Sequence, residues 1–411
     1  MARPTRRVVR PLPEPTPVPL AFVLPPVVAA FAPLPDPRVE RTKRHALLDI
    51  VAITLCAVIA GAETWVDIAE FGQAREAWFR TFLALPHGIP SHDTFGRVFT
   101  RLDPVAFARC FQAWVATVAT LAEGEVVALD GKTVRGSGRL SGTGAAREGA
   151  LHVVSAWACE AGLTLGQVRT PTKGNEITAL PELLALLDVA GTVVTIDAIG
   201  CQTALAAQIR AQGADYLLAV KQNQPWLHNR IVAAFADAQA HAWRRGGHAV
   251  PHTAATSIEK DHGRIETRHV TAVPAAALLV DRSAWADLTS VVRVEATRQR
   301  MRPGGGVAPG RPETRYYITS LAPAAARLGA VVRRHWSIEN RCHWTLDVSF
   351  HEDACRIRRD HAPENLAFVR KVALALLRQD RTHKHGLTSK RLRAGWDHDY
   401  LQTVLRGARA D

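Results

Sequence analysis

The chain has 411 residues, of which 47% are hydrophobic and 22% charged, and this length allows two or three folded units. Its formal net charge of +13 favours an acidic partner, and nucleic acid is the commonest partner of a large basic protein. Only eight of the 51 basic residues are lysine, so an arginine-rich codon bias also contributes to the charge.

The longest apolar run, Ile50 to Ala62, is too short to cross a membrane, which excludes an ordinary membrane-spanning protein. Six scattered cysteines without a CxxC pair indicate reduced thiols rather than a disulfide framework.

The N-terminal region is rich in proline. Residues 1–38 hold eleven of the 24 prolines and show no hydrophobic period, which predicts an extended, mostly disordered arm. A basic stretch followed by the apolar patch Val18–Ala30 outlines a signal peptide, but Pro25 and Pro26 interrupt that patch. We therefore expect a cytoplasmic, nucleoid-associated protein.

Residues 39–123 have the pattern of an all-helical domain. Apolar residues recur every three or four positions in His45–Ala62 and in Thr64–Ala84. Ser91 is suited to cap a further helix, and Pro104 to open another. The pattern fits a domain that binds DNA ends and fits a plain helical support equally well.

The pattern changes to strands and helices at Gly124. The expected strands are followed by helices in an order typical of a ribonuclease-H-like α/β fold, with hairpins first and parallel crossovers afterwards. The expected elements are strands 125–130, 151–159 and 164–170, helix 175–188, strand 192–197, helix 202–212 and strand 216–220. Residues 124–379 are thus expected to form a catalytic domain, with a strand-rich insertion at about 226–321 and a basic tail at 380–411.

Two of the expected buried strands end in a carboxylate, Asp130 and Asp197. In open sheets the chemistry gathers at the carboxyl ends of strands, and buried carboxylates on neighbouring strands repel each other unless a cation binds them. These two residues therefore indicate a divalent metal site, although either aspartate alone could simply cap a helix.

A third carboxylate is expected from the later helical region. On an α-helix, His335, Glu339 and His343 would share one face, so Glu339 is the first candidate. Asp347, Glu352 and Asp353 are rival third ligands. A mixed zinc site is a further alternative, and its ligands would be Cys342, His343, His351 and Cys355.

Five blocks of the sequence closely resemble the H-repeat-associated type of DDE transposase from bacterial insertion sequences. The resemblance runs from about residue 36 to residue 378, and the helical segment with Ile89-Pro90-Ser91 and Thr94 looks like that family's associated domain. The blocks are Asp130-Gly131-Lys132, Asp197 to Gln202, Val220 to Gln224, His262 to Arg268, and His335 to Asn340 with His343-Trp344.

The resemblance implies a catalytic and metal-binding triad of Asp130, Asp197 and Glu339. It implies Mg²⁺ or Mn²⁺, with two ions of the kind that assist phosphoryl transfer, and DNA as substrate, both as inverted-repeat ends and as target. A homodimer would pair the two ends. The related hairpin-forming transposases carry a tyrosine, an arginine and a lysine where this chain has Val332, His335 and Leu346, which leaves hairpin formation open.

The expected DNA contacts are Lys132, Lys221, Arg334, Gln202 and Asn223. Each of the three basic residues among them could equally be a surface charge. Two other functions also remain open from the sequence: another ribonuclease-H-like nuclease, such as a junction resolvase, or a domesticated transposase that only binds DNA.

Overall fold

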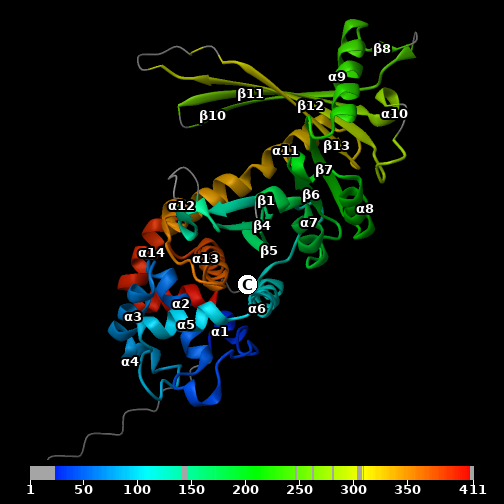
Figure 1. Cartoon of the computed structure of the whole chain (residues 1–411). Coiled ribbons are helices and arrows are strands. Elements are labelled where there is room, and N and C mark those ends of the chain that lie inside the picture. The colour runs from blue at the N-terminus through cyan, green and yellow to red at the C-terminus, as the bar shows by residue number, and fades with distance from the viewer. Residues whose placement is uncertain are drawn as a thin grey trace, which may run out of the picture.

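The computed structural model describes residues 24–140, 147–171, 173–245, 248–261, 263–279, 282–302, 308 and 310–407. Within them the chain is a mixed α/β protein, in which helices pack around one large sheet and a group of helices forms one end of the molecule (Figure 1). Residues 1–23 and His262 lie outside the described residues, and the expectations placed on them stay predictions.

A helical unit precedes the sheet, as the sequence indicated. Helix α3 begins with a capping box between Thr64 and Asp67, and α6 begins at Pro104 behind the capping carboxylate of Asp103. The helices are α1 (Pro26–Ala29), α2 (Leu47–Ile59), α3 (Trp65–Ala74), α4 (Glu76–Phe79), α5 (His92–Arg101) and α6 (Pro104–Val118).

The central sheet has nine strands in the order β10-β11-β12-β13-β7-β6-β1-β4-β5. Strands β1, β6 and β7 are parallel to one another, and all other neighbours are antiparallel. The strands are β1 (Val126–Val134), β4 (Leu151–Ala158), β5 (Leu163–Thr170), β6 (Val193–Ile196), β7 (Asp215–Val220), β10 (Thr253–Asp261), β11 (Arg264–Pro274), β12 (Ser290–Arg300) and β13 (Pro312–Thr319). Two short pairs lie apart, β2 (Arg139–Leu140) with β3 (Arg147–Glu148) and β8 (Arg244–Arg245) with β9 (His248–Ala249).

Helices cover both faces of the sheet. Side chains alternate between the two faces along a strand. Thr195 contacts His335 of α11 on one face, whereas Glu176 of α7 packs against Gly131 on the opposite face. The remaining helical elements are α7 (Glu176–Ala185), α8 (Thr203–Ala211), α9 (Pro225–Ala240), α10 (Ala275–Leu278), α11 (Ala325–His335), the π-helix η5 (Ile338–His343), α12 (Trp344–Phe350), the 3₁₀ turn η6 (Glu352–Ala354), α13 (Ala362–Gln379), α14 (Leu387–Trp396) and α15 (His398–Arg406).

Residues 24–38 do not form the disordered arm that the sequence indicated. Pro26 opens helix α1, and Val27, Val28, Phe31 and Leu34 are buried in the main core. The Phe31 ring lies 4.9 Å from that of Phe107. The expectation of a disordered arm over residues 1–38 is therefore wrong for residues 24–38, because a proline suits the first turn of a helix and does not prevent the residues after it from packing.

The predicted basic tail at 380–411 is also corrected by the structure. Residues 387–406 form α14 and α15, which pack on α2 and α1 and bury Tyr400, Leu401, Val404 and Leu405. Helix α13 packs against α2, α5 and α6 as well, so the C-terminal part of the chain completes the helical unit (Figure 1). Charged residues around these apolar positions had masked the amphipathic pattern.

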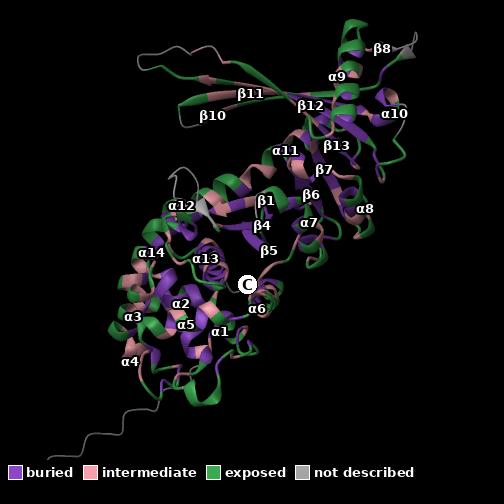
Figure 2. Cartoon of the chain, in the orientation of Figure 1, coloured by how far each residue is buried: buried purple, intermediate pink, exposed green. Residues whose placement is uncertain are grey.

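The expected insertion continues the central sheet instead of standing apart from it. Strand β13 pairs with β7, and β12, β11 and β10 follow outward. Strand β10 is largely exposed, and the outer halves of β11 and β12 are half-buried or exposed, so the three strands project from the body as a ribbon, whereas the inner halves of β11 and β12 are buried (Figure 2). Helix α9 and strand β10 were not recognised in the sequence.

Among the described residues, no helix combines the length and the apolar character that a bilayer requires.

Candidate active site

Parallel pairing brings Asp130 and Asp197 side by side. Leu129 pairs with Ile196 at the end of β6, so Asp130 and Asp197 are the next residues on two neighbouring strands. Such strands lie about 4.8 Å apart, and residues in register point to the same face. The expectation that a strand ends at Asp130 is wrong, because β1 continues to Val134 through its pairing with β4. Only the parallel pairing of β1 with β6 ends next to Asp130.

Asp197 also caps the loop that follows it. Its Oδ1 accepts a hydrogen bond of 3.0 Å from the Ile199 N–H, at the start of a 3₁₀ turn. The capping role weighed from the sequence is therefore present. The capping hydrogen bond uses Oδ1 of Asp197, and the residue also lines a cavity at this edge of the sheet.

Glu339 follows helix α11, which packs over β1 and β6. The helix does not continue as a uniform α-helix, because residues 338–343 form the π-helix η5. The single face expected for His335, Glu339 and His343 therefore does not exist in that form, since a π turn changes the angular spacing of the side chains. Such turns are frequent at functional sites. Glu339 itself is exposed and lines a groove.

The charges of the three acids interact. Burial is the main cause that raises the pKa of Asp130 to about 7. A hydrogen bond from the Gly131 N–H opposes the rise, whereas the charges of Asp197, Glu339 and Glu176 add to it. Glu339 is thus within electrostatic reach of Asp130 although it lies 209 positions further along the sequence. Neutral Asp130 is favoured until a positive charge arrives.

Two imidazoles line this face of the sheet. His343 Nδ1 lies 3.5 Å from Asp130 Oδ2, and burial, followed by the charges of Lys371 and Lys132, lowers the pKa of His343 to about 3. His335 Nδ1 lies 3.0 Å from Thr195 Oγ1, and burial lowers its pKa to about 4. Both rings are therefore neutral at pH 7, and neither neutralises the carboxylates.

A buried pair behind Asp130 was missed in the sequence. His152 Nε2 lies 2.8 Å from Glu176 Oε1, and His152 Nδ1 lies 2.7 Å from Thr133 Oγ1. A Cβ at Gly131 would collide with Glu176 and His152, which explains the glycine after Asp130. Only the strand register reveals this pair, because His152 lies opposite Thr133 on β4.

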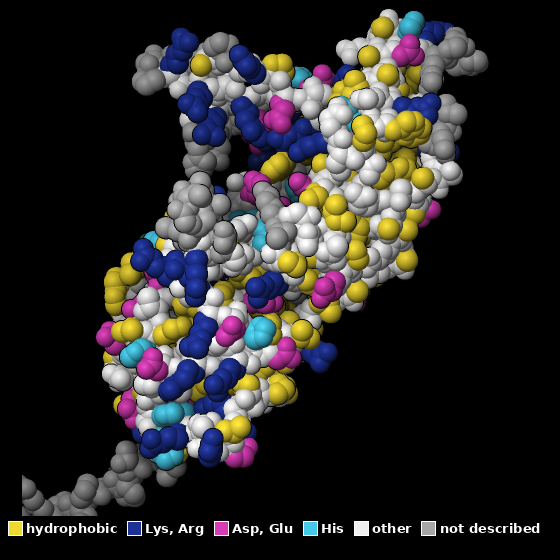
Figure 3. Space-filling model, viewed as in Figure 1, with side chains coloured by type: hydrophobic (Ala, Val, Ile, Leu, Met, Phe, Trp, Pro, Cys, Tyr) yellow, Lys and Arg dark blue, Asp and Glu magenta, His cyan; other side chains and the backbone are white. Residues whose placement is uncertain are grey.

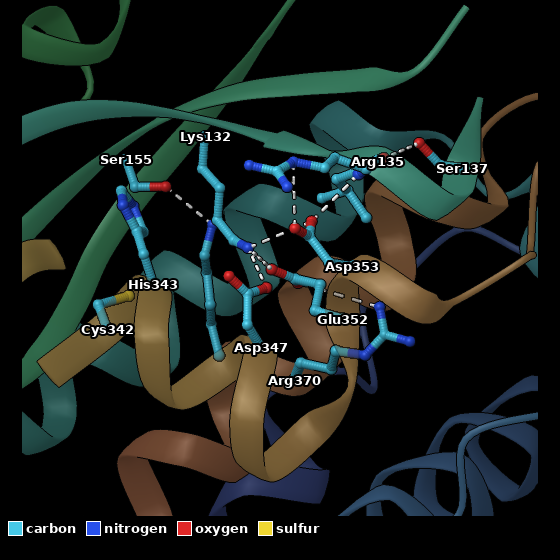
Figure 4. A network of polar contacts seen from close by, with 12 residues as sticks. Lys132, Arg135, Ser137, Ser155, Cys342, His343, Asp347, Glu352, Asp353 and Arg370 are labelled. Carbon is cyan, nitrogen blue, oxygen red and sulfur yellow. Dashed lines mark hydrogen bonds and ion pairs between the residues drawn. The ribbon is translucent and has the colours of Figure 1, made fainter. Parts of the chain in front are cut away.

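Lys132 has a different place from the one expected. Its side chain is 8% exposed, and its ammonium pairs with Asp347 and lies 3.5 Å from Glu352 and 3.6 Å from Asp353 (Figure 4). Three carboxylates already surround the Lys132 charge, so these contacts lend no support to Lys132 as a DNA phosphate contact, and that role stays a prediction. The three carboxylates are those of Asp347, Glu352 and Asp353, the rival third metal ligands, and all three face Lys132.

The chain turns sharply to form this cluster. His351 adopts a left-handed conformation (φ 48°) at the end of α12, which folds Glu352 and Asp353 back toward β1. A Cβ at Gly136 would collide with the carbonyl groups of Asp353 and Cys355, so the 3₁₀ turn that follows β1, η2 (Arg135–Ser137), packs directly on η6.

The other expected DNA contacts are spread around Asp197 and beyond it. Lys221 is exposed and lines the same cavity as Asp197. The Asn223 amide donates to the Ala198 carbonyl, and Gln202 is half-buried before α8. Arg334 is exposed and pairs with Glu160 at 2.5 Å. The structure thus brings Lys221 and Asn223 near Asp197, whereas Arg334 has a partner elsewhere.

The donor set fits a hard divalent cation. Three carboxylates offer the oxygen ligands that Mg²⁺ and Mn²⁺ prefer, and a cation would relieve the repulsion that raises the pKa of Asp130. His343 Nε2 is also buried and has no hydrogen-bond partner within the described residues. In the part of the chain that the structure describes, no three His, Cys, Asp or Glu side chains lie close enough to enclose a metal ion.

The zinc alternative finds no support in these contacts. Cys342 is buried against Thr164, whereas its neighbour His343 faces Asp130. The two side chains therefore point to different surroundings.

Two hollows meet at the site. A cavity of about 200 Å³ beside Asp197 is walled by Tyr316, Tyr317 and Trp336. A larger groove of about 860 Å³ runs between the ribbon and the α11–η5 segment, and Glu339 lines it. Arg315, Tyr317 and Trp336 line both hollows, with the Arg315 guanidinium 4.6 Å from the centre of the Trp336 ring. Glu339 thus faces the groove and Asp197 faces the smaller cavity next to it, whereas Asp130 lines neither hollow.

Comparison with known proteins identifies the family. The profile described as "Transposase DDE domain" matches residues 122–376, and the profile described as "DDE_Tnp_1-associated" matches residues 28–115. The proposed transposase YncI of Escherichia coli O157:H7 is 38% identical over 90% of this chain and 92% of its own. The proposed H repeat-associated transposase YhhI of Escherichia coli (strain K12) is 37% identical over 91% of this chain and 96% of its own.

A solved structure overlaps more distantly. A piggyBac transposase in a synaptic complex with hairpin DNA aligns over 91% of this chain and 77% of its own, but only with a TM-score of 0.41 and 8% identity. The resemblance noted in the sequence is confirmed by the family profiles and the two relatives: this chain belongs to the DDE transposases, in their H-repeat-associated group, and is a DNA-cleaving transposase.

Proposed function

We propose that Asp130, Asp197 and Glu339 form the catalytic centre that cuts DNA at the ends of an insertion sequence and joins the freed ends to target DNA. The observation that carries this proposal is the register of β1 and β6, which places two aspartates side by side beneath the helix that leads to Glu339. The pKa of Asp130, raised to about 7, supports it because both other acids contribute to the rise.

The strands around these acids correspond to a ribonuclease-H-like core. We assign that core to the five strands β5-β4-β1-β6-β7, in which an antiparallel meander precedes parallel crossovers. The order is the one expected from the sequence, and it supports the fold assignment.

The three carboxylates would hold Mg²⁺ or Mn²⁺. When bound, divalent cations lower the pKa of an attacking water or 3′-hydroxyl and stabilise the leaving oxygen of a phosphodiester. Asp197 is held in place by its bond from Ile199, and His343 lies next to Asp130 as a neutral ring. Glu339, which is exposed, would move inward to complete the ligand set, because the three acids do not enclose a metal as they stand.

Lys221 and Asn223 are suited to contact the DNA strand near Asp197. Lys221 is exposed at the cavity beside that residue, and Asn223 fixes the loop after it. Gln202 and Arg334 stay proposed contacts of lower specificity. Synapsis of two DNA ends would require two copies of the chain, so we propose a homodimer.

The substitution Asp197→Asn tests the proposal. It keeps the shape of the side chain and removes one negative charge, so Mg²⁺-dependent nicking of a supercoiled plasmid that carries the element's ends should fall at least about a hundredfold. Binding to the same DNA, measured by fluorescence anisotropy, should stay within about twofold.

The exposed acid Glu182→Gln provides a control with the same loss of charge outside the site. Nicking by Asp197→Asn at the rate of this control would remove Asp197 from the mechanism. If the wild-type protein binds the ends but never cuts them, the chain acts only as a DNA-binding protein.

A further inference from the structure

The groove beneath the ribbon is lined mainly by basic side chains. It lies between β10–β13 on one side and α11–η5 on the other. Seven basic residues line it and only three acidic ones, and Glu339 is among the acids. The basic residues are Lys260, Arg264, Arg268, Arg298, Arg315, Arg333 and Arg341. Figure 3 shows Lys and Arg side chains gathered along the ribbon and in the hollow beneath it.

The two faces of the ribbon differ in charge. On β11, Arg264, Glu266 and Arg268 line the groove, whereas Ile265 and Thr267 between them point away from it. On β12, Arg298 lines the groove and its neighbours Thr297 and Gln299 point away. The outer part of the groove face thus carries four charged side chains on these two strands, whereas the other face has Ile265, Thr267, Thr297 and Gln299 there, with the Arg293–Glu295 pair further inward.

Two glutamates hold three of these arginines in place. Glu266 lies 2.7 Å from Arg268 and 3.1 Å from Arg298. Glu259 lies 3.1 Å from Arg268 and also pairs with Arg333 of α11, across the groove. Each glutamate thus bridges two guanidinium groups, as a phosphate of a DNA backbone does. Arg268, Glu259 and Glu266 are only partly exposed, at 18%, 26% and 21%, whereas Arg298 and Arg333 are 56% and 54% exposed.

We propose that this groove is the track along which duplex DNA reaches the catalytic acids, and that Glu259 and Glu266 occupy the phosphate positions when no DNA is bound. The proposal rests on the function proposed above. It adds the surface that binds DNA and the two glutamates that weaken this binding. The two glutamates keep the arginine side chains in positions from which they can bind the phosphates of the DNA backbone. They also weaken binding to any duplex, because each phosphate must displace a carboxylate and then lie near its charge.

This arrangement predicts an increase in affinity when a glutamate is neutralised. Anisotropy of a fluorescein-labelled duplex of about 30 base pairs and arbitrary sequence, measured in EDTA, gives the affinity without cleavage. Glu266→Gln and Glu259→Gln should each tighten binding roughly threefold, which is the scale of one partly exposed ion pair. Arg298→Ala should weaken binding and reduce the slope of log K against log salt by about 0.9.

The control Glu295→Gln changes the net charge of the protein equally. Glu295 lies on the same strand β12 but points away from the groove and pairs with Arg293 at 3.2 Å. Its substitution should leave the affinity unchanged within error. A gain of affinity also cannot arise from unfolding, so misfolded variants cannot imitate the expected result.

Three outcomes would overturn the proposal. These are equal tightening in Glu295→Gln and Glu266→Gln, no tightening in either groove variant, or tighter binding of a single strand than of the duplex. Failure of the catalytic assignment would look different, because binding in EDTA does not depend on Asp197. If Asp197→Asn still cuts DNA while the groove variants behave as expected, only the assignment of the acids fails.

Discussion

Asp130 is destabilised as an anion by its own surroundings. It is largely buried, and Asp197, Glu339 and Glu176 all raise its pKa in the same direction. A carboxyl group with a pKa near 7 is half protonated at neutral pH, so small changes in nearby charge alter its ionisation. This property suits a residue whose charge is needed only when a cation is bound.

The pH dependence of stability follows from that pKa. Asp130 has a pKa of about 7 in the folded chain and about 3.9 in the unfolded chain, so the folded state binds an extra proton between these values. Folding stability therefore decreases as pH rises from 4 to 7 and is lowest above 7 for this group. In EDTA at pH 8, Asp130→Asn should raise the free energy of unfolding, by on the order of 4 kcal/mol at most.

Differential scanning calorimetry checks this at pH 8 and pH 4. The melting temperature of Asp130→Asn should exceed that of the wild type at pH 8 and match it near pH 4. The same difference at both pH values would show that Asp130 is not the group that titrates.

At the scale of elements, Lys132 ties the strand of Asp130 to the segment after Glu339. It lies two residues beyond Asp130 and pairs with Asp347, which is 215 positions away in the sequence. Arg370 of α13 lies 3.9 Å from Glu352 in the same cluster (Figure 4). These contacts fix where η5 and α12 lie relative to β1, and therefore where Glu339 lies relative to Asp130.

Removal of the Lys132 charge should loosen this connection. Lys132→Met leaves three partly buried carboxylates without their central cation, which should lower the free energy of unfolding by about 3–5 kcal/mol. Adding Asp347→Asn to this variant should restore part of the loss, because one of the unpaired charges is then gone. Urea unfolding followed by tryptophan fluorescence measures both effects.

The surface pair of Arg334 and Glu160 offers the comparison. Arg334→Ala removes an ion pair between residues that are 49% and 37% exposed, and it should change stability by at most about 1 kcal/mol. A Lys132→Met protein as stable as Arg334→Ala would show that the cluster contributes little.

At the scale of the whole molecule, the first and last helices of the described chain pack together. Helix α15 packs on α1 and α2, and α13 contacts both the helical unit and strand β5. Phe368 of α13 lies 5.3 Å from Phe111 of α6, and both helices contact β5, so the helical unit is packed against the sheet. Damage to the C-terminal helices should therefore be felt by the N-terminal ones.

Leu401 and Leu392 test this dependence. Leu401 is fully buried, so Leu401→Ala should lower the free energy of unfolding by about 2–5 kcal/mol. Leu392 is 49% exposed, and Leu392→Ala should cost less than about 1 kcal/mol. Hydrogen exchange of α2 should accelerate in the first variant only. Unchanged exchange in α2 would mean that the C-terminal helices are an independent appendage.

The sequence indicated the succession of strands and helices over residues 125–220 and the two aspartates, because both depend on local patterns. Buried apolar runs that lead to Asp130 and Asp197 are visible without a structure. The sequence could not reveal the continuation of β1 past Asp130, because that depends on pairing with β4. It also could not show that Lys132 faces Asp347, since charges far apart in the chain have no preferred partner until the fold brings them together.

The contacts in the groove could not be predicted from the sequence either. Glu259 and Glu266 look like ordinary surface charges in the sequence, and only the register of β10, β11 and β12 brings them against the arginines. The π-helix is a further example, because residues 338–343 have the composition of an ordinary α-helix.

The most direct test of the catalytic centre is metal rescue of cysteine variants. Asp130→Cys, Asp197→Cys and Glu339→Cys each replace a hard oxygen ligand by a sulfur, which binds Mg²⁺ poorly and the softer Mn²⁺ better. If all three acids hold the metal, each variant should lose plasmid nicking in Mg²⁺ and recover it in part in Mn²⁺, whereas Glu176→Cys should show no such change of metal preference. A Glu339→Cys protein that cuts DNA in Mg²⁺ as fast as the wild type would contradict the account.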